Sequence, residues 1–144
     1  MKYEFLNHTA DAKFKAYGSN LEKAFENAAL ATFSILLDTD KVKPVIKKDI
    51  KIISRKKTSL LYDFIDELLF FLDTEGFLLN TVSNLKIEND ENYILTCTIM
   101  GDSFKNYSDV RGNVKGVTYN DMVIDESFSE ELDKKVMLQV VVDL

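Results

Sequence analysis

The alternation of apolar and polar positions predicts a strand followed by a long helix in the first quarter of the chain. Residues 12–17 alternate strictly, with Lys13 and Lys15 on either side of Phe14, as in a half-buried strand. Gly18 interrupts this pattern, and Ser19 with Glu22 has the spacing of a capping box. Apolar residues then recur at helical spacing, which predicts a helix over residues 21–37.

A second helix and several strands are expected in the rest of the chain. After a short strand at 49–54, Thr58 or Ser59 is a candidate cap for the helix that precedes Gly76. Its apolar stripe consists of Leu61, Phe64, Ile65, Leu68, Leu69 and Leu72. Beyond Gly76 the pattern indicates strands at 82–88, 93–100, 114–124 and 135–142, with turns or loops at 89–92 and 125–133.

The order of these elements predicts the class of fold. The last strand is apolar on nearly every position, which favours a central place in a sheet that helices cover on one face. Helices among strands, without repeated βαβ units, indicate an α+β fold. We therefore expect a two-layer sandwich of a mixed, largely antiparallel sheet with two main helices, in a single domain over residues 1–144.

Charge and composition narrow the functional classes. The net charge is −6, and Arg55 and Arg111 are the only arginines among 18 basic residues, so independent tight RNA binding is not expected. No apolar run reaches the ~20 residues of a membrane span, and none resembles a signal peptide. The single cysteine, Cys97, excludes an internal disulfide, and we expect a cytoplasmic protein.

The sequence offers little machinery for nucleophilic or nucleotide chemistry. His8 is the single histidine and is interpreted as a structural imidazole, since no serine or cysteine lies in an activating motif. Cys97 falls in the middle of a predicted strand, where a small buried side chain is usual. Neither glycine-rich phosphate-binding motif is present, so the nucleotide-binding enzymes of those classes are excluded.

The chain end is the most unusual candidate for chemistry. An apolar strand runs to Val142 and is followed directly by Asp143 and Leu144. The Asp143 side chain and the Leu144 α-carboxylate would lie so close that they repel each other unless a cation or a hydrogen-bond donor intervenes. Ca²⁺, Mg²⁺ or Mn²⁺ would fit such oxygen ligands. Asp11, at the start of an early strand, could supply a third oxygen. The spacing alone still favours the alternative that Asp143 is a solvated residue at a strand end.

Four segments in order along the chain resemble the archease family. They are the Phe5-Leu6-Asn7-His8-Thr9-Ala10-Asp11 stretch, the Leu21 to Phe25 segment with Glu22 and Glu26, the Val114-Lys115-Gly116-Val117-Thr118-Tyr119 element and the closing Val141-Val142-Asp143-Leu144. Together with the expected helix over 60–72, the resemblance covers the whole chain.

The resemblance implies an accessory protein rather than an enzyme. Archease proteins activate the GTP-dependent RNA ligase of tRNA splicing and RNA repair by promoting guanylylation of the ligase histidine and multiple turnover. Carried over to this chain, the metal ligands would be Asp11, Asp143 and a backbone oxygen of Leu144, with Ca²⁺ the first candidate and Mg²⁺ or Mn²⁺ possible. Lys115 would contact the ligase or a nucleotide phosphate, and RNA would be met only through the ligase.

Two departures from the family pattern and two alternative functions stay open. The family often has Ala and His where this chain has Gly116 and Asn120, so Asn120 is left out of the site. A stand-alone metal-dependent phosphoester hydrolase would use the same carboxylates but needs a water-activating group. A chaperone-like binding module would give Asp143 a purely structural role.

Overall fold

A computed structural model describes residues 1–7 and 11–144 of the chain. Short 3₁₀ turns at Thr39–Lys41, Phe104–Asn106 and Leu132–Lys134 connect some of the main elements. The strands are β1 (Tyr3–Leu6), β2 (Asp11–Gly18), β3 (Ile46–Ser54), β4 (Phe77–Asn89), β5 (Tyr93–Ser103), β6 (Gly116–Asp125) and β7 (Val136–Asp143), and the helices are α1 (Leu21–Ser34) and α2 (Lys57–Glu75).

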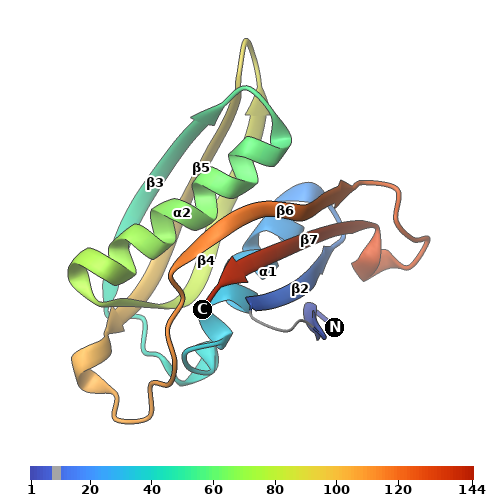
Figure 1. The fold of residues 1–144 in the computed structure, drawn as a ribbon. Helices are drawn as coiled ribbons and strands as arrows, with labels where there is room; N and C mark the ends of the chain where they lie inside the picture. Colours follow the sequence, from blue (N-terminus) through green and yellow to red (C-terminus); the bar gives the residue numbers. More distant parts are fainter. Residues whose placement is uncertain (8–10) are drawn as a thin grey trace.

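The strands form two antiparallel sheets whose strand directions cross (Figure 1). One sheet has the order β1-β2-β7-β6 and the other the order β3-β5-β4, and all strand pairs within the described residues are antiparallel. In the first sheet β7 lies between β2 and β6 and is buried on both faces, as its apolar sequence predicts. The central position of the last strand is therefore confirmed.

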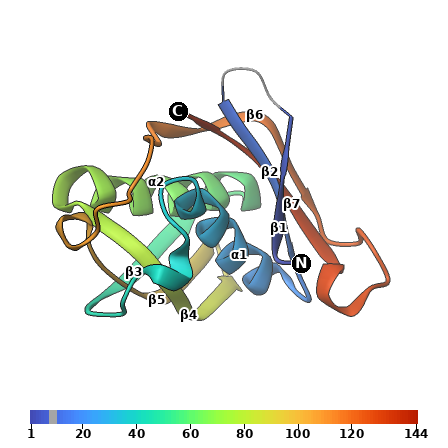
Figure 2. The ribbon, with the colours of Figure 1, turned by 90° about the horizontal axis from the view of Figure 1, so that it is seen from below.

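The two helices lie between the sheets (Figure 2). Helix α1 contacts β2 and β7 on one side and β4 on the other, while α2 packs on the β3-β5-β4 sheet and also reaches β6. A continuous core joins both helices to both sheets, and Phe14, Phe25, Phe64, Phe77 and Leu138 are fully buried within it. Because the core is shared by both sheets, the helices hold the first sheet in place relative to the second.

Helix α1 begins and ends differently from the sequence prediction. Its N-cap is Asn20, whose side-chain oxygen accepts a hydrogen bond of 2.8 Å from the Lys23 backbone N–H, so the expected Ser19 cap is wrong. The helix ends at Ser34 rather than at residue 37. Leu36 and Leu37 continue the apolar spacing because they are buried in the turn after the helix, where they pack into the same core.

Helix α2 has a well-defined C-terminal end and an unusual start. Lys56 occupies the N-cap position, and the Ser59 hydroxyl reaches back to accept a hydrogen bond of 3.3 Å from the Lys56 backbone N–H. Neither Thr58 nor Ser59 is therefore the N-cap itself. At the other end Gly76 takes a left-handed conformation with φ of 66° and lets the Phe104 ring pack against it.

The α+β class with two main helices is confirmed, and three strand details are corrected. The strands are divided between two sheets, where a single mixed sheet was expected. A strand that was not predicted is present at Tyr3–Leu6. Strands β3 and β4 begin earlier than expected, at Ile46 and Phe77, whereas β6 begins later, at Gly116.

Neither helix in the described part of the chain is long and apolar enough to cross a membrane.

Candidate functional site

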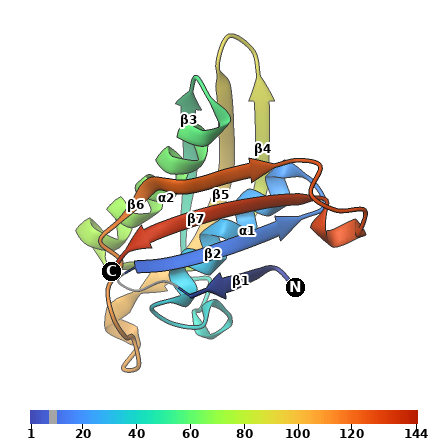
Figure 3. The ribbon, with the colours of Figure 1, turned by 45° about the vertical axis from the view of Figure 1, so that its right-hand side comes forward.

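Asp11 and Asp143 lie directly opposite each other at one end of the first sheet. They are the terminal register partners of the antiparallel pair β2–β7, and Gly116 of β6 pairs with Asp143 on its other side. Opposite residues in such a pair have Cα atoms roughly 4.5–5.5 Å apart, so both side chains belong to one small region. Figure 3 shows the C-terminus beside the starts of β2 and β6.

The position of Asp143 follows from the burial of β7. Val140, Val141 and Val142 are at most 1% exposed, whereas Asp143 is exposed and Leu144 is 43% exposed. The apolar residues therefore fix the strand in the sheet as far as Val142, and the chain leaves the core at Asp143. The carboxylate of Asp143 is presented to solvent at a defined place.

Lys115 is tied to the same end of the sheet through its backbone. Its N–H donates a hydrogen bond of 2.8 Å to the Asp143 carbonyl oxygen. Its side chain is exposed, and within the described residues its ammonium group has no ion-pair partner. The structure thus brings together Asp11, Asp143 and Lys115, which are far apart in the sequence.

The chemistry of this end of the sheet suits a hard cation. Asp11 and Asp143 offer carboxylate oxygens, and the main chain of Leu144 can add a further oxygen. No cluster of three or more His, Cys, Asp or Glu side chains in residues 1–7 and 11–144 is placed to hold a metal ion. The predicted set has only two such side chains, so main-chain oxygens and solvent would have to complete the coordination.

The remaining members of the His-Thr-Ala-Asp element, His8, Thr9 and Ala10, lie outside the described residues. The interpretation of His8 as a structural imidazole therefore stays a prediction.

Gly116 and Asn120, the two departures from the family pattern, lie on β6. A Cβ atom added at Gly116 meets no heavy atom within 4 Å, so a larger residue would fit there. The Asn120 backbone N–H donates a hydrogen bond of 2.8 Å to the Thr118 hydroxyl, next to an irregularity in the β6–β7 register. The residue after Asn120, Asp121, takes a positive φ of 56°, which bends the strand here.

A stacked tyrosine pair connects the Val-Lys-Gly-Val-Thr-Tyr element to α2. The rings of Tyr62 and Tyr119 lie 4.3 Å apart with an angle of 12° between their planes. Burial, followed by the negative charge of Asp63, raises the pKa of the Tyr119 hydroxyl. The sequence did not predict this pair, because a contact between a strand and a distant helix leaves no local pattern.

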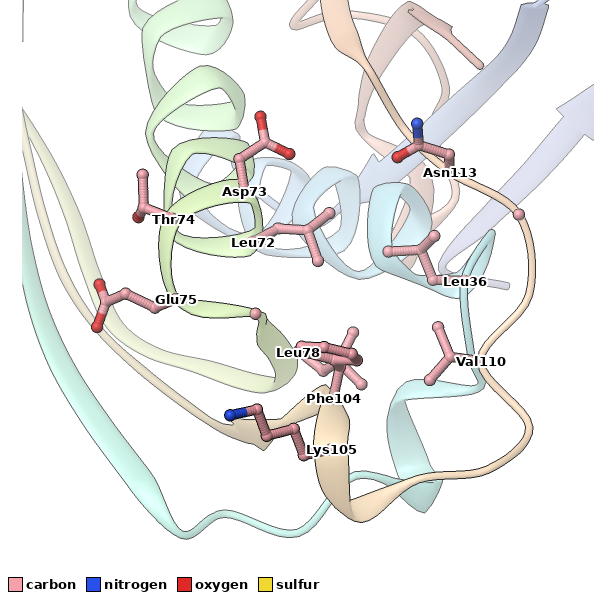
Figure 4. A pocket seen from close by; sticks show the side chains of 12 residues that line it. Leu36, Leu72, Asp73, Thr74, Glu75, Leu78, Phe104, Lys105, Val110 and Asn113 are labelled. Carbon is pink, nitrogen blue, oxygen red and sulfur yellow. The ribbon is translucent and has the colours of Figure 1, made fainter.

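A separate cavity of about 480 Å³ lies at the C-terminal end of α2 (Figure 4). Leu36, Leu72 and Val110 surround it, Asp73 and Asn113 lie at one end, and Lys105 lies at the other. Its walls combine apolar side chains with the polar side chains of Asp73, Thr74, Glu75, Lys105 and Asn113, and no His or Cys is among the described residues that line it. Asp73, Glu75 and Lys105 are of residue types that can transfer protons, but none of the residues that the family resemblance assigns to the site lies in this lining.

Cys97 is not a candidate nucleophile. It lies within β5, is 6% exposed, and burial raises the pKa of its thiol to about 12. A thiol with this pKa is protonated at neutral pH, which confirms the interpretation of Cys97 as a small buried side chain.

Comparison with known proteins gives a consistent family match. The model of the Archease protein family (MTH1598/TM1083) matches residues 3–144. The chain is similar to the protein named archease of Methanothermobacter thermautotrophicus, with 43% identity over 144 residues that cover 99% of this chain and 98% of the relative. The chain is also similar to the archease of Pyrococcus furiosus, with 36% identity over 146 residues that cover 99% of each protein.

A solved structure shows the same fold. The solution structure of Methanobacterium thermoautotrophicum protein 1598 superposes with a TM-score of 0.79 at 38% sequence identity, and the match covers 99% of each chain. Both sheets and both helices therefore have counterparts in an experimentally determined relative.

Proposed function

Because this chain belongs to the archease family, we propose that it is an accessory protein that activates a GTP-dependent RNA ligase of tRNA splicing and RNA repair. It would promote guanylylation of the ligase's own histidine and thereby multiple turnover, without joining RNA ends itself. The observation that carries this proposal is the convergence of Asp11, Asp143 and Lys115 at one end of the β2–β7–β6 sheet. These are the residues that the family resemblance assigns to the metal site and to the ligase contact.

We further propose that Asp11, Asp143 and a main-chain oxygen of Leu144 hold a divalent cation, with Ca²⁺ the first candidate and Mg²⁺ or Mn²⁺ next. The opposed carboxylates support this, since their negative charges are close and oxygen atoms are the ligands these ions prefer. When bound, the cation would supply a positive charge at the sheet end that neutralises the carboxylates. The paired strands would hold Asp11 and Asp143 in place before the partner arrives.

Lys115 has two separable roles in the proposal. Its backbone N–H orients the Asp143 main chain through the 2.8 Å hydrogen bond. Its side chain is exposed and lacks an ion-pair partner within the described residues, so its ammonium group is available to a ligase carboxylate or a nucleotide phosphate. The same residue would thus link the metal ligands to the partner.

Charge supports a protein partner that handles RNA rather than RNA itself. The chain carries a net charge of −6, and RNA-binding proteins present Lys and Arg to the phosphate backbone. A basic ligase would attract this acidic protein and orient it during encounter. The protein would contact RNA only through the ligase. Its location would be the cytoplasm, where reducing conditions are compatible with the single unpaired cysteine.

Guanylylation of the purified ligase tests the proposal. The rate at which the guanylylated ligase forms is measured with GTP and the wild-type protein, the Asp143→Ala variant, and Asp90→Ala as a control in the exposed β4–β5 turn. We expect stimulation by the wild type and the control and its loss in Asp143→Ala with the fold intact. Equal stimulation by Asp143→Ala would rule out the proposed site, and phosphoester turnover without ligase would favour the hydrolase alternative.

A further inference from the structure

The face of the first sheet that points away from the helices, here called the outer face, carries a lysine next to Asp11 and Asp143. Along β2 the fully buried Phe14 points to the core, so Lys13 and Asp11 both point to the outer face. Lys13 pairs in register with Val141, and Asp143 follows Val141 by two residues. Neighbours of this kind lie roughly 7–8 Å apart between Cα atoms, a distance that a lysine side chain can span.

The ammonium group of Lys13 is nevertheless paired with a residue on a different strand. Its Nζ lies 3.4 Å from Asp121 Oδ2 of β6. Because β7 lies between β2 and β6, the side chain of Lys13 crosses the outer face above Val141 (Figure 3). Only 21% of this side chain is exposed, so its stem lies along the sheet. Lys13 thus neutralises a carboxylate of β6 instead of that of Asp143.

Asp121 is held in place through its main chain. It lies in the irregular part of β6 with a φ of 56°, a conformation that aspartate adopts more readily than most residues. Its carbonyl oxygen accepts a hydrogen bond of 2.8 Å from Gln139 Nε2. Gln139 precedes Val141 by two residues, whereas Asp143 follows it by two. The hydrogen bond therefore anchors Asp121 on the side of Lys13 that is remote from Asp143.

The direction in which Lys13 points matters for a cation at Asp143. An ammonium group and a divalent cation are attracted by the same carboxylate, so a lysine paired with Asp143 would have to be displaced before the cation binds. A lysine paired with Asp121 does not compete in this way. A strand that departs from regular geometry beside a candidate site is also the kind of local feature that function explains better than stability.

We propose that Asp121 is a positioning residue of the cation site, which holds Lys13 away from Asp143 and so keeps the Asp143 carboxylate open to a divalent cation. Asp121 itself does not touch the cation, because it acts through Lys13. Gln139 supports this role by fixing the main chain of Asp121. The inference rests on the metal site of the proposed function and adds residues that the family resemblance does not assign to that site.

Two substitutions, made singly and together in the full chain, test this role. Asp121→Asn removes the charge that holds Lys13, while asparagine tolerates the positive φ and keeps the carbonyl that Gln139 binds. Lys13→Met removes the ammonium group but keeps an unbranched stem above the sheet. Asp125→Asn is the control, since it removes a charge farther along β6 and keeps an oxygen that can accept the hydrogen bond from the Ser127 N–H.

The Kd for Ca²⁺ alone is measured by calorimetry at physiological salt, where charges more than about 8 Å apart are largely screened. We expect Asp121→Asn to raise the Kd roughly 3- to 10-fold, because the released lysine turns to Asp143. In the Lys13→Met background the same substitution should change the Kd less than about twofold. Lys13→Met alone should leave the Kd unchanged or lower it, and Asp125→Asn should bind Ca²⁺ like the wild type. Unfolding temperatures with a chelator show whether each variant is folded.

The pattern of the four Kd values decides whether Asp121 acts through Lys13. An equal loss of affinity from Asp121→Asn in both backgrounds would mean that the charge of Asp121 acts on the cation directly, and the inference would be wrong. A single Asp121→Asn variant that is folded and binds Ca²⁺ like the wild type would overturn it as well. A loss that disappears in the Lys13→Met background supports it.

Ligase stimulation, measured in parallel, separates this inference from the proposed function. If the wild type binds Ca²⁺ and stimulates the ligase but the Kd values show no coupling between Lys13 and Asp121, the inference is overturned and the proposed function stands. If the wild type binds Ca²⁺ without stimulating the ligase, the proposed function fails and the four Kd values alone decide the inference. If the wild type binds none of Ca²⁺, Mg²⁺ and Mn²⁺, the metal site and the inference are both rejected.

Discussion

Asp11 of β2 lies directly across the sheet from Asp143 of β7, at the last register position that the two strands share. The two residues are held there by a strand pair whose other members are largely buried. Like charges placed directly opposite each other destabilise a strand pair. A bound cation would offset such repulsion and use the two carboxylates as ligands.

Calcium should therefore stabilise the wild-type fold through Asp143. At a free Ca²⁺ concentration of 100 times the Kd, binding adds about 2.7 kcal/mol to the free energy of unfolding, which corresponds to a rise in Tm of roughly 5–10 °C. In Asp143→Asn the rise should be absent, while with a chelator the variant should unfold at the wild-type temperature or slightly above it, because one of two opposed charges has been removed. Differential scanning calorimetry with and without Ca²⁺ measures this. An equal rise in both proteins would contradict the metal site, and Asp90→Asn is the control in the exposed turn.

The two roles of Lys115 can be separated by two substitutions. Lys115→Ala removes the ammonium group but keeps the backbone N–H that binds the Asp143 carbonyl at 2.8 Å. Ca²⁺ affinity should then change less than about twofold, while ligase stimulation falls. Lys115→Pro removes the N–H donor as well, at a cost of roughly 0.5–1.5 kcal/mol, and should weaken both Ca²⁺ binding and stimulation. Calorimetric Ca²⁺ titrations beside the guanylylation assay distinguish the two, and a large loss of Ca²⁺ affinity in Lys115→Ala would contradict this division.

The central strand and both helices could be predicted because their signals are local. Val136 to Val142 are apolar on both faces, and Gly76 marks the end of α2. The division into two sheets could not be predicted, because β2 pairs with β7 across more than a hundred residues and no period in the sequence encodes that choice. The C-terminal end of α1 was predicted too late because Leu36 and Leu37 keep the apolar spacing of the helix. They are buried, but they lie in the turn that follows it.

The candidate site, too, could be predicted from the sequence only in part. The apolar strand before Asp143 indicated that this carboxylate is fixed, but the spacing could not decide between a ligand and a solvated residue. The contacts that define the site are a strand register and a backbone hydrogen bond from Lys115, and neither depends on the type of side chain. The family resemblance supplied the connection that the local pattern lacked.

The Tyr17 hydroxyl should make stability depend on pH in the alkaline range. It donates a hydrogen bond to Glu4 Oε1, and burial together with this contact raises its pKa from an ordinary value of 10.0 to about 12. Between pH 10 and about 12 the folded protein thus retains a proton that the unfolded chain loses. The hydroxyl's contribution to the free energy of unfolding is therefore present below pH 10 and is lost as the pH rises to about 12.

Tyr17→Phe tests this linkage. The variant should be less stable than the wild type by about 1 kcal/mol at pH 8, because Glu4 loses its donor, and the difference should shrink as the pH rises from 10 to 12. Urea unfolding at pH 8, 10 and 11 measures it. Tyr3→Phe, in the neighbouring strand, is the control for the loss of a tyrosine hydroxyl. A difference for Tyr17→Phe that stays constant with pH would show that the hydroxyl does not hold its proton more tightly in the folded state.

Gly116 and Gly18 should respond in opposite ways to the same added methyl group. At Gly116, beside Asp143, an added Cβ meets nothing within 4 Å, so Gly116→Ala should be neutral or stabilising by up to about 1 kcal/mol, because alanine restricts the unfolded chain. At Gly18 the added Cβ would lie 2.3 Å from the Ala24 backbone nitrogen, a contact that a shift of one side chain cannot relieve. Gly18→Ala should therefore destabilise the fold by roughly 1–3 kcal/mol or more, since β2 and α1 must move apart. Urea unfolding of both variants at neutral pH measures the difference. Destabilisation by Gly116→Ala would mean that the sheet end beside Asp143 is more tightly packed than the open space at Gly116 implies.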